Sequence, residues 1–338
     1  MAENTRQSNA NKGFRYWFTQ IILGLFILLL MPIPVGIVWQ FLARRLESGK
    51  YLPLGKLTDV DGHFMHIYCT GEGSPTVILE GGVPEWSIHW QKVQPEIATF
   101  TRVCSYDRAG YGWSDVGPGP RTAKKIVDEL HTLLRNSGEQ GPFVYVAHSF
   151  WGPAALLYQQ TYPFKIVGMV LIEAWSPDLF TPVPDVITQS LPLAQTLHSI
   201  APLGQVRLVG ELGILPLADM LQAKLLPAEL QPVYKAAYYD DGMWGTMYEE
   251  YSAMNESGLQ TQGIASLGDL PLIVVKAGNR PANDYPSDEV WDATQESLAG
   301  LSSQGELVVA ETSGHFVQLE NPELVVEAIR RVVEKASP

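Results

Sequence analysis

The sequence has little cysteine and no excess of positive charge. Cys69 and Cys104 do not form a CxxC pair, and two cysteines cannot build a structural zinc site alone. Both lie in strand-like runs, which favours buried free thiols. The alternative is a disulfide between neighbouring strands, which requires an oxidising compartment. Acidic residues outnumber basic ones, 36 to 23, and the net charge is −13. This balance disfavours a nucleic-acid partner, whose phosphates attract a clustered basic face.

The usual motifs for cofactors and metals are also missing from the sequence. It contains no P-loop, no GxGxxG after a strand-like run, no HExxH and no paired histidines at metal-ligand spacing. We therefore expect no cofactor and no metal. Long runs of like charge and internal repeats are absent as well.

A long apolar run lies near the start of the chain. From Ile21 to Leu42 no residue is charged, and about 20 mostly apolar residues suffice for a helix to cross a bilayer. Aromatic residues flank the run, as is typical of membrane interfaces. We expect a polar tail over residues 1–15 and a transmembrane helix over residues 16–46. The protein would then be a single-pass membrane protein that contacts the lipid bilayer through residues 16–46.

Basic residues on the two sides of this run do not decide its orientation. Cationic side chains both precede and follow it: Arg6, Lys12 and Arg15 before, and Arg44, Arg45, Lys50 and Lys56 after. The positive-inside rule therefore favours neither topology. The side of the membrane on which the rest of the chain lies stays open.

From about Leu57 onward, strand-like runs alternate with helical ones. The first two strand-like runs meet at Asp61-Gly62, a hairpin signal. Alternation of this kind predicts an α/β fold, with helices on both faces of a mostly parallel sheet. Residues 176–267 lack such strands, and a structureless loop of that length is improbable. We expect a domain over residues 50–338, with a helical lid over residues 176–267 inserted into it.

The stretch "YVAHSFWG", Tyr145 to Gly152, places Ser149 where a strand turns into a helix. One large enzyme class presents a nucleophilic serine at such a corner, with glycine two residues before and two after. Here those positions hold Ala147 and Trp151. Because the family position normally holds glycine, we expect the Trp151 indole to crowd the strands below or to enter the pocket above. Overpacking a tight site costs about 1–3 kcal/mol. Taken alone, Ser149 could also be an ordinary helix N-cap.

Two further motifs decide between these interpretations. "ETSGHFVQLENPELV" places His315 just after a strand-like run. "VCSYDRAGYGWSD" predicts a turn after another strand-like run, in which we expect Asp107 and Arg108 to satisfy buried backbone groups. In order and spacing, the motifs resemble the α/β-hydrolase superfamily, esterase-like serine hydrolases with an inserted lid. The resemblance covers about Leu57 to Ala336. It implies an eight-stranded, mostly parallel sheet with helices on both faces.

The resemblance also implies roles for particular residues. Ser149 would be the nucleophile. A serine hydroxyl needs an adjacent base to become nucleophilic, and His315 would be that base. Backbone N–H groups of Gly82 and Phe150 would form the oxyanion hole, with Val83 as the next candidate. His148 adjoins Ser149 but points to the opposite side of its strand.

Two residues compete for the role of the acid that orients His315. In the family, this acid commonly follows the seventh strand, where Asp284 lies in a loop rich in Pro and Asn. Some members place it after the sixth strand, where Glu173 stands at the strand end. We favour Glu173, with Asp284 as the rival.

These expectations add up to a membrane-anchored serine hydrolase that cleaves carboxylic esters through an acyl-enzyme. Trp86, Trp151 and Trp175 would line the pocket and predict a small-molecule apolar ester as substrate. One alternative is an amide or peptide hydrolase of the aminopeptidase branch, which would need an acidic site for the substrate amine. Candidate residues for that site are Asp240, Asp241, Glu249 and Glu250. The other alternative is a catalytically impaired hydrolase fold used for binding, a hypothesis that Trp151 keeps open.

Overall fold

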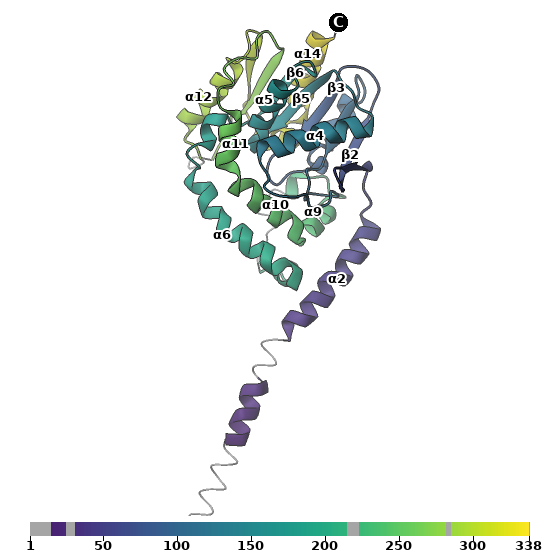
Figure 1. Ribbon diagram of the computed structural model, residues 1–338, viewed down its shortest axis with the longest axis vertical. Coiled ribbons are helices and arrows are strands. Elements are labelled where there is room, and N and C mark those ends of the chain that lie inside the picture. Colours follow the sequence, from purple (N-terminus) through teal and green to yellow (C-terminus); the bar gives the residue numbers. More distant parts are fainter. Residues whose placement is uncertain (1–14, 25–30, 215–222, 282–284, 338) are drawn as a thin grey trace, which may run out of the picture.

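The computed structural model describes residues 15–24, 31–214, 223–281 and 285–337. In these residues an eight-stranded sheet forms the centre of the body, in the order β1-β2-β4-β3-β5-β6-β7-β8 (Figure 1). The two strands of the opening hairpin pair in antiparallel fashion, and β2 is also antiparallel to β4. All other neighbours are parallel. The strands are β1 (Lys56–Val60), β2 (His63–Thr70), β3 (Thr76–Glu80), β4 (Val103–Tyr106), β5 (Phe143–His148), β6 (Ile166–Ile172), β7 (Leu272–Ala277) and β8 (Gly305–Ala310).

Helices cover both faces of this sheet, which confirms the predicted fold class. On one face, α4 (Ala123–Ser137), α5 (Gly152–Thr161) and α12 (Asp288–Ala299) contribute to one apolar core. On the other face, α3 (Gln94–Ile97) and α14 (Pro322–Ala336) contribute to a second core. Every residue of β3 and of β5 is buried. Burial on both faces explains why these strands read as nearly continuous apolar runs.

Helices and short helical turns make up most of the described chain between β6 and β7. We call α6, α7, α9, α10, α11 and the short turns among them the inserted helices. They pack on loops that follow β3 and β4, where Trp86, Ile88 and Tyr111 join their apolar core. The helices are α6 (Asp185–Ile200), α7 (Gln205–Glu211), α9 (Gln231–Tyr238), α10 (Asp241–Ser252) and α11 (Met254–Thr261), and the turns are η3 (Pro177–Phe180), η4 (Ala201–Leu203) and η5 (Ala223–Leu225).

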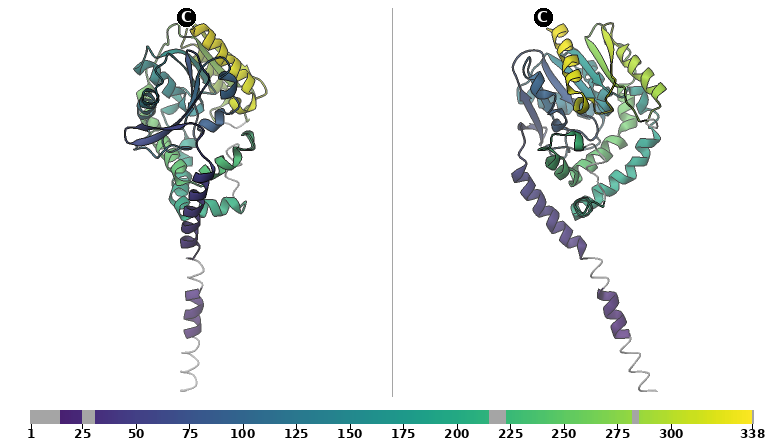
Figure 2. Two further views of the ribbon diagram at one scale, coloured as in Figure 1. Left: turned by 90° about the vertical axis from the view of Figure 1, so that its right-hand side faces the viewer. Right: turned by 180° about the vertical axis from the view of Figure 1, so that it is seen from behind.

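Helix α2 (Pro32–Lys50) packs on the inserted helices rather than standing apart from the body (Figure 2). The buried Arg207 of α7 donates to Gln40 at 2.7 Å and to both carboxylate oxygens of Glu47 at 2.6 and 2.7 Å. A Cβ atom on Gly36 would lie 2.2 Å from the carbonyl oxygen of Leu203, so only glycine permits this approach. The folded body therefore begins within α2, well before the expected domain boundary at residue 50.

The expected transmembrane helix over residues 16–46 falls on two described helical stretches. Residues 15–24 are helical and α2 begins at Pro32, while residues 25–30 lie outside the described part of the chain. Of the helices that the structure describes, none combines the length and the apolar character needed to cross a bilayer.

The prediction of free thiols is wrong, because Cys69 and Cys104 form a disulfide. The two residues stand directly opposite each other on the antiparallel strands β2 and β4, with their Cα atoms 4.1 Å apart. Cα atoms in non-hydrogen-bonded antiparallel pairs approach to about 4.5 Å, which brings two side chains on one face together. This register depends on long-range strand pairing.

We predict that replacing both cysteines lowers stability. The bridge closes a sequence separation of 35 residues, and loop-closure entropy gives such a cross-link about 3–4 kcal/mol. Urea unfolding of Cys69→Ala/Cys104→Ala should show this loss, and fully reduced wild-type protein should match the variant. Wild-type protein that reacts with a thiol reagent after denaturation without reductant would contradict the disulfide.

Candidate active site

Ser149 stands in a strained turn directly after β5. Its φ angle is 58°, in the left-handed region of backbone conformation that residues other than glycine rarely adopt. Such strain costs about 1–3 kcal/mol and is concentrated at functional sites. The next residues form a short turn, η2 (Ser149–Trp151), which leads into α5. The Trp175 N–H donates to the Ser149 carbonyl at 3.0 Å and fixes the corner from the β6 side.

The structure brings together Ser149, His315 and Glu173. The Ser149 Oγ lies 2.8 Å from His315 Nε2, and His315 Nδ1 lies 3.1 Å from Glu173 Oε2. Glu173 follows β6, and its other oxygen accepts hydrogen bonds from the Ala277 N–H at 2.7 Å and from Trp291 Nε1 at 3.0 Å. Asp284, the rival acid, lies outside the described residues.

The Glu173 carboxylate is suited to orient an imidazole. Burial alone would raise its pKa, but hydrogen bonds from His315, Ala277 and Trp291 together lower that pKa below its ordinary value. The charged carboxylate favours a proton on His315 Nδ1. His315 Nε2 is then free to accept the proton of the Ser149 hydroxyl, the arrangement that activates a serine nucleophile.

Gly82 lies against Ser149, but its N–H does not point into an open site. A Cβ atom on Gly82 would lie 2.8 Å from Ser149 Cβ, so glycine is required for this approach. The Gly82 N–H donates to Glu85 Oε2 at 2.5 Å, which conflicts with the donor role expected of it. Among the described residues, the N–H groups of Phe150 and Val83 have no acceptor. Phe150 and Val83, both named as candidates from the sequence, therefore stay the candidate backbone donors.

A buried pair of Glu85 and His148 links two loops of the site, and no sequence motif predicts it. Glu85 Oε2 lies 2.7 Å from His148 Nδ1, and Glu85 Oε1 accepts a hydrogen bond from Gln318 at 3.0 Å. His148 Nε2 lies 2.9 Å from the carbonyl oxygen of His315. His148 and Ser149 are consecutive, and their side chains point to opposite sides of the chain. The His148 ring nevertheless reaches the backbone of His315.

The charges of this pair follow from its surroundings. Burial opposes the ionisation of Glu85, but His148 and the Gly82 N–H lower its pKa to about 2. Burial likewise opposes the protonation of His148, but Glu85 raises its pKa above the ordinary value. The contribution of Glu85 to stability is lost as the pH falls through about 2, and that of His148 as the pH rises through its raised pKa. Between these limits an ion pair holds the Gly82 loop to the His315 loop.

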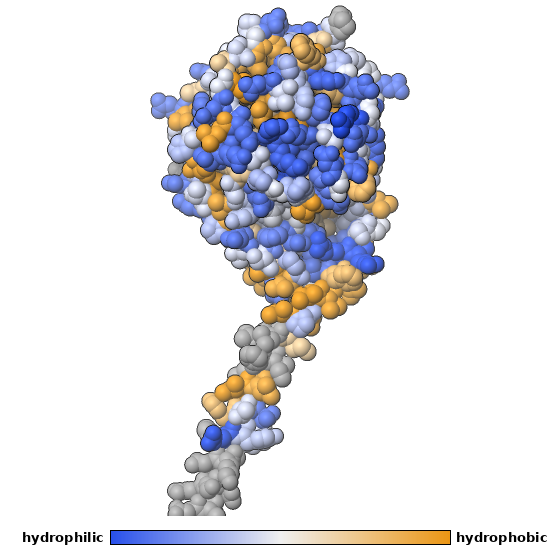
Figure 3. All heavy atoms as spheres, viewed as in Figure 1, coloured by the Kyte–Doolittle hydropathy of each residue, from blue (hydrophilic) through white to orange (hydrophobic). Residues whose placement is uncertain are grey.

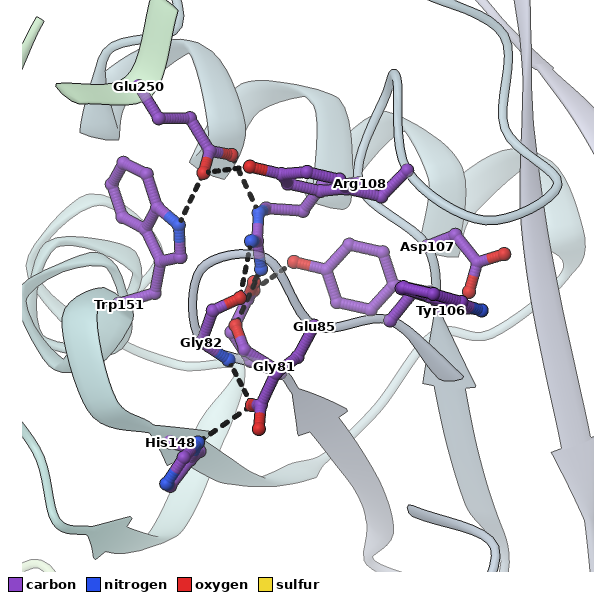
Figure 4. A network of polar contacts seen from close by, with 12 residues as sticks. Gly81, Gly82, Glu85, Tyr106, Asp107, Arg108, His148, Trp151 and Glu250 are labelled. Atoms are coloured by element: carbon purple, nitrogen blue, oxygen red, sulfur yellow. Dashed lines mark hydrogen bonds and ion pairs between the residues drawn. The ribbon is translucent and has the colours of Figure 1, made fainter. Parts of the chain in front are cut away.

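Arg108 forms the centre of a second buried network, which Figure 4 shows from close by. Its guanidinium donates to the carbonyl oxygens of Gly81 and Gly82 at 2.5 and 2.7 Å and to Glu80 at 2.7 Å. Its Nε donates to Glu250 of α10 at 2.9 Å. The prediction that Arg108 satisfies buried backbone is confirmed. The link to Glu250 was not predicted, and it ties an inserted helix to the loop beside Ser149.

Trp151 belongs to this network rather than to a substrate pocket. The residue is fully buried, and its indole N–H donates to Glu250 at 3.3 Å beside the Arg108 guanidinium. The close packing expected of a glycine at this position occurs one residue later. A Cβ atom on Gly152 would lie 2.7 Å from the Trp175 carbonyl oxygen. Trp151 is tolerated because Gly152 takes the place of the missing glycine.

The other two predicted pocket tryptophans lie on different sides of the site. Trp175 packs beside Phe150, with ring centroids 5.7 Å apart. Trp86 is buried and stacks on Tyr234 at 5.2 Å. It also lines a cavity of about 770 Å³ between α2 and the loops after β3 and β4. Neither Ser149 nor His315 is among the residues that line this cavity.

The sequence pattern of the Alpha/beta hydrolase family matches residues 77–328. The chain belongs to this family. A curated relative, the uncharacterized protein YbdG of Bacillus subtilis, is 22% identical over 258 residues, which cover 74% of this chain and 77% of the relative.

Solved structures of two enzymes share the fold. A thermophilic esterase from Thermogutta terrifontis is 20% identical, with a TM-score of 0.63, and the match covers 84% of this chain and 99% of the esterase. An epoxide hydrolase from Vigna radiata is 19% identical, with a TM-score of 0.64, and the match covers 83% of this chain and 97% of that enzyme. With these neighbours, the fold is that of a hydrolase.

We predict that Glu250→Gln slows the reaction of Ser149 with a fluorophosphonate by at least about tenfold. The substitution keeps the size of the side chain but removes the charge that holds Arg108 against the Gly81–Gly82 carbonyls. Loss of one complete oxyanion donor costs about 10²–10³-fold, so a loosened loop should cost part of that. The measurement is the second-order rate constant of labelling.

Glu129→Gln is a matched control. Glu129 of α4 forms a buried ion pair with Arg121, which stands just before that helix, at 2.7 and 2.8 Å. Both substitutions remove a buried charge and should lower the melting temperature, but the control should label at the wild-type rate. Equal labelling rates in the two variants would show that the Arg108 network supports the fold alone.

Proposed function

We propose that this protein is a serine hydrolase that cleaves carboxylic esters through an acyl-enzyme. The observation that carries the proposal is the hydrogen-bonded chain from Ser149 Oγ through His315 to Glu173. In the first half-reaction, Ser149 Oγ attacks the ester carbonyl carbon while His315 Nε2 takes its proton. The C–O bond to the alcohol then breaks, and His315 returns the proton to the leaving oxygen. A water molecule, deprotonated by His315, hydrolyses the acyl-enzyme and regenerates Ser149.

Backbone N–H groups would stabilise the tetrahedral intermediate by donating hydrogen bonds to its oxyanion. Phe150 follows the nucleophile directly, and Val83 belongs to the loop that Arg108 holds against Ser149. Donors fixed before the reaction stabilise a developing oxyanion without any cost of reorganisation during the step. Epoxide hydrolases with this fold use a carboxylate nucleophile, and the position after β5 holds a serine here. The ester reaction is therefore preferred over epoxide opening.

The charges on the inserted helices favour an ester over a peptide substrate. An aminopeptidase would need an unpaired carboxylate to bind the substrate amine. Glu250 is paired with Arg108, and both Asp240 and Asp241 lie within 3.1 Å of Arg44. The fourth candidate, Glu249, is exposed on the surface of α10 beside Gly119, away from the Ser149 loop. Near Ser149, the Phe150 side chain packs with Trp175, Phe180 and Tyr251. These apolar surroundings support a small apolar ester as the substrate.

We also propose that residues 16–46 attach the protein to a lipid bilayer, with the hydrolase domain on the oxidising side of the membrane. The uncharged run from Ile21 to Leu42 supports the attachment. The disulfide between Cys69 and Cys104 supports the side, because disulfides persist in oxidising compartments and are rare where glutathione keeps thiols reduced.

We predict that Ser149→Ala abolishes both fluorophosphonate labelling and the hydrolysis of p-nitrophenyl esters. A residual rate above that of water can survive from the oxyanion donors alone. The folded state should remain intact, as checked by circular dichroism and melting temperature. Hydrolysis at the wild-type rate in this variant would rule out the serine mechanism.

Glu173→Gln and Asp284→Asn should differ sharply in kcat. Loss of the acid that orients the histidine typically costs about 10⁴-fold, so the first variant should lose about that much. Asp284→Asn serves as the control and should be nearly neutral. If Glu173→Gln is neutral and Asp284→Asn is impaired, the acid has been assigned to the wrong residue.

A further inference from the structure

Helix α2 carries apolar side chains on the side that faces away from the body. Val35, Val38, Leu42 and Leu46 are each more than half exposed. A surface helix in water normally shows the reverse pattern, with its apolar stripe toward the core and its polar residues outside. Water is therefore an unfavourable environment for the outer side of α2.

Three polar side chains of α2, those of Gln40, Arg44 and Glu47, have partners on the inserted helices. Gln40 donates to the Tyr239 carbonyl at 2.7 Å and accepts from Arg207, which also binds Glu47. Arg44 binds Asp240 at 2.7 Å. Polar groups satisfied internally, beneath an apolar exterior, are what a helix in contact with lipid requires, because hydrocarbon offers no hydrogen bonds.

The apolar exterior continues from α2 onto the inserted helices. Helix α7 packs beside α2, where a Cβ atom on Gly204 would lie 2.3 Å from the Gly36 carbonyl oxygen. Just beyond α7, Leu212 and Ile214 are 64% and 65% exposed. Figure 3 shows apolar atoms gathered at the end of the body from which α2 emerges.

Two observations identify a bilayer as the partner of this surface. The helical residues 15–24 precede α2 and also expose large apolar side chains, among them Trp17 and Phe18. Cationic residues then follow the apolar part of α2, at Arg44, Arg45 and Lys50. Aromatic and cationic side chains at the two ends of an apolar segment match the headgroup regions of a membrane.

We propose that α2 and the end of α7 dock on the lipid bilayer through one membrane face, formed by Val35, Val38, Leu42, Leu46, Leu212 and Ile214. The inserted helices then rest on the membrane, and the cavity behind α2 lies at the level of the lipid headgroups. This inference rests on the proposed membrane attachment and adds that the inserted helices themselves contact lipid.

The test uses the full-length protein reconstituted into vesicles of phosphatidylcholine and phosphatidylglycerol. Both native cysteines are held in the disulfide, so a single introduced cysteine can be labelled with an environment-sensitive nitrobenzoxadiazole dye. We would place the dye at Leu42→Cys, at Leu212→Cys and at Phe164→Cys. Phe164 is the control, because it is 95% exposed and follows α5 rather than α2 or α7. Emission from dye at positions 42 and 212 should shift to the blue and be quenched by doxyl-labelled lipid. Dye at position 164 should show neither effect.

The outcomes separate this inference from the proposals on which it builds. Protein that fails to float with the vesicles would contradict the membrane attachment itself. Protein that floats, with dye at 212 behaving like dye at 164, would overturn only the docking of α7. A blue shift at 212 that needs no lipid and accompanies dimer formation in light scattering would make the face a contact between protein chains and overturn the inference. None of these measurements depends on ester hydrolysis.

Discussion

One buried cation, the guanidinium of Arg108, holds three parts of this molecule in place. A buried charge must be paired and hydrogen-bonded, because an unpaired one costs several kcal/mol. Arg108 meets that requirement through Glu80 at the end of β3, the carbonyls of Gly81 and Gly82, and Glu250 on α10. The loop beside Ser149 and the helix above it are thereby fixed by the same group. Trp151, which donates to Glu250, completes this arrangement and explains why an indole can stand where the family has glycine.

A second buried pair, Glu85 and His148, acts on the same loop beside Ser149. Glu85 holds the N–H of Gly82, and its partner His148 holds the carbonyl of His315, so one ion pair spans the two loops that flank Ser149. Together with Arg108 it leaves little freedom for the backbone around the site. Such preorganisation is the condition under which backbone donors are most effective, because they need not reorient as charge develops.

The sequence was sufficient for what depends on local pattern and chain order. Alternating runs predicted the sheet. The family resemblance implied Ser149, His315 and, ahead of Asp284, Glu173, and these three residues meet in the structure. The rest depends on contacts between distant segments. Glu250 reaches Arg108 across 142 positions, and Trp291 reaches Glu173 across 118, so no local pattern signals either. The disulfide depends on the register of β2 and β4. The apolar run that includes the start of α2 indicated a membrane segment. It did not indicate that Gln40 and Glu47 of α2 bind Arg207.

The central claim is that Ser149 becomes covalently acylated during turnover. The most direct measurement mixes the enzyme with a p-nitrophenyl ester, stops the reaction in acid within the first turnover, and maps the acyl group by peptide mass spectrometry. The account predicts a burst of p-nitrophenol stoichiometric with enzyme and one acyl group, on the peptide that contains Ser149. Turnover without an acyl adduct, or with the adduct on another residue, would contradict it.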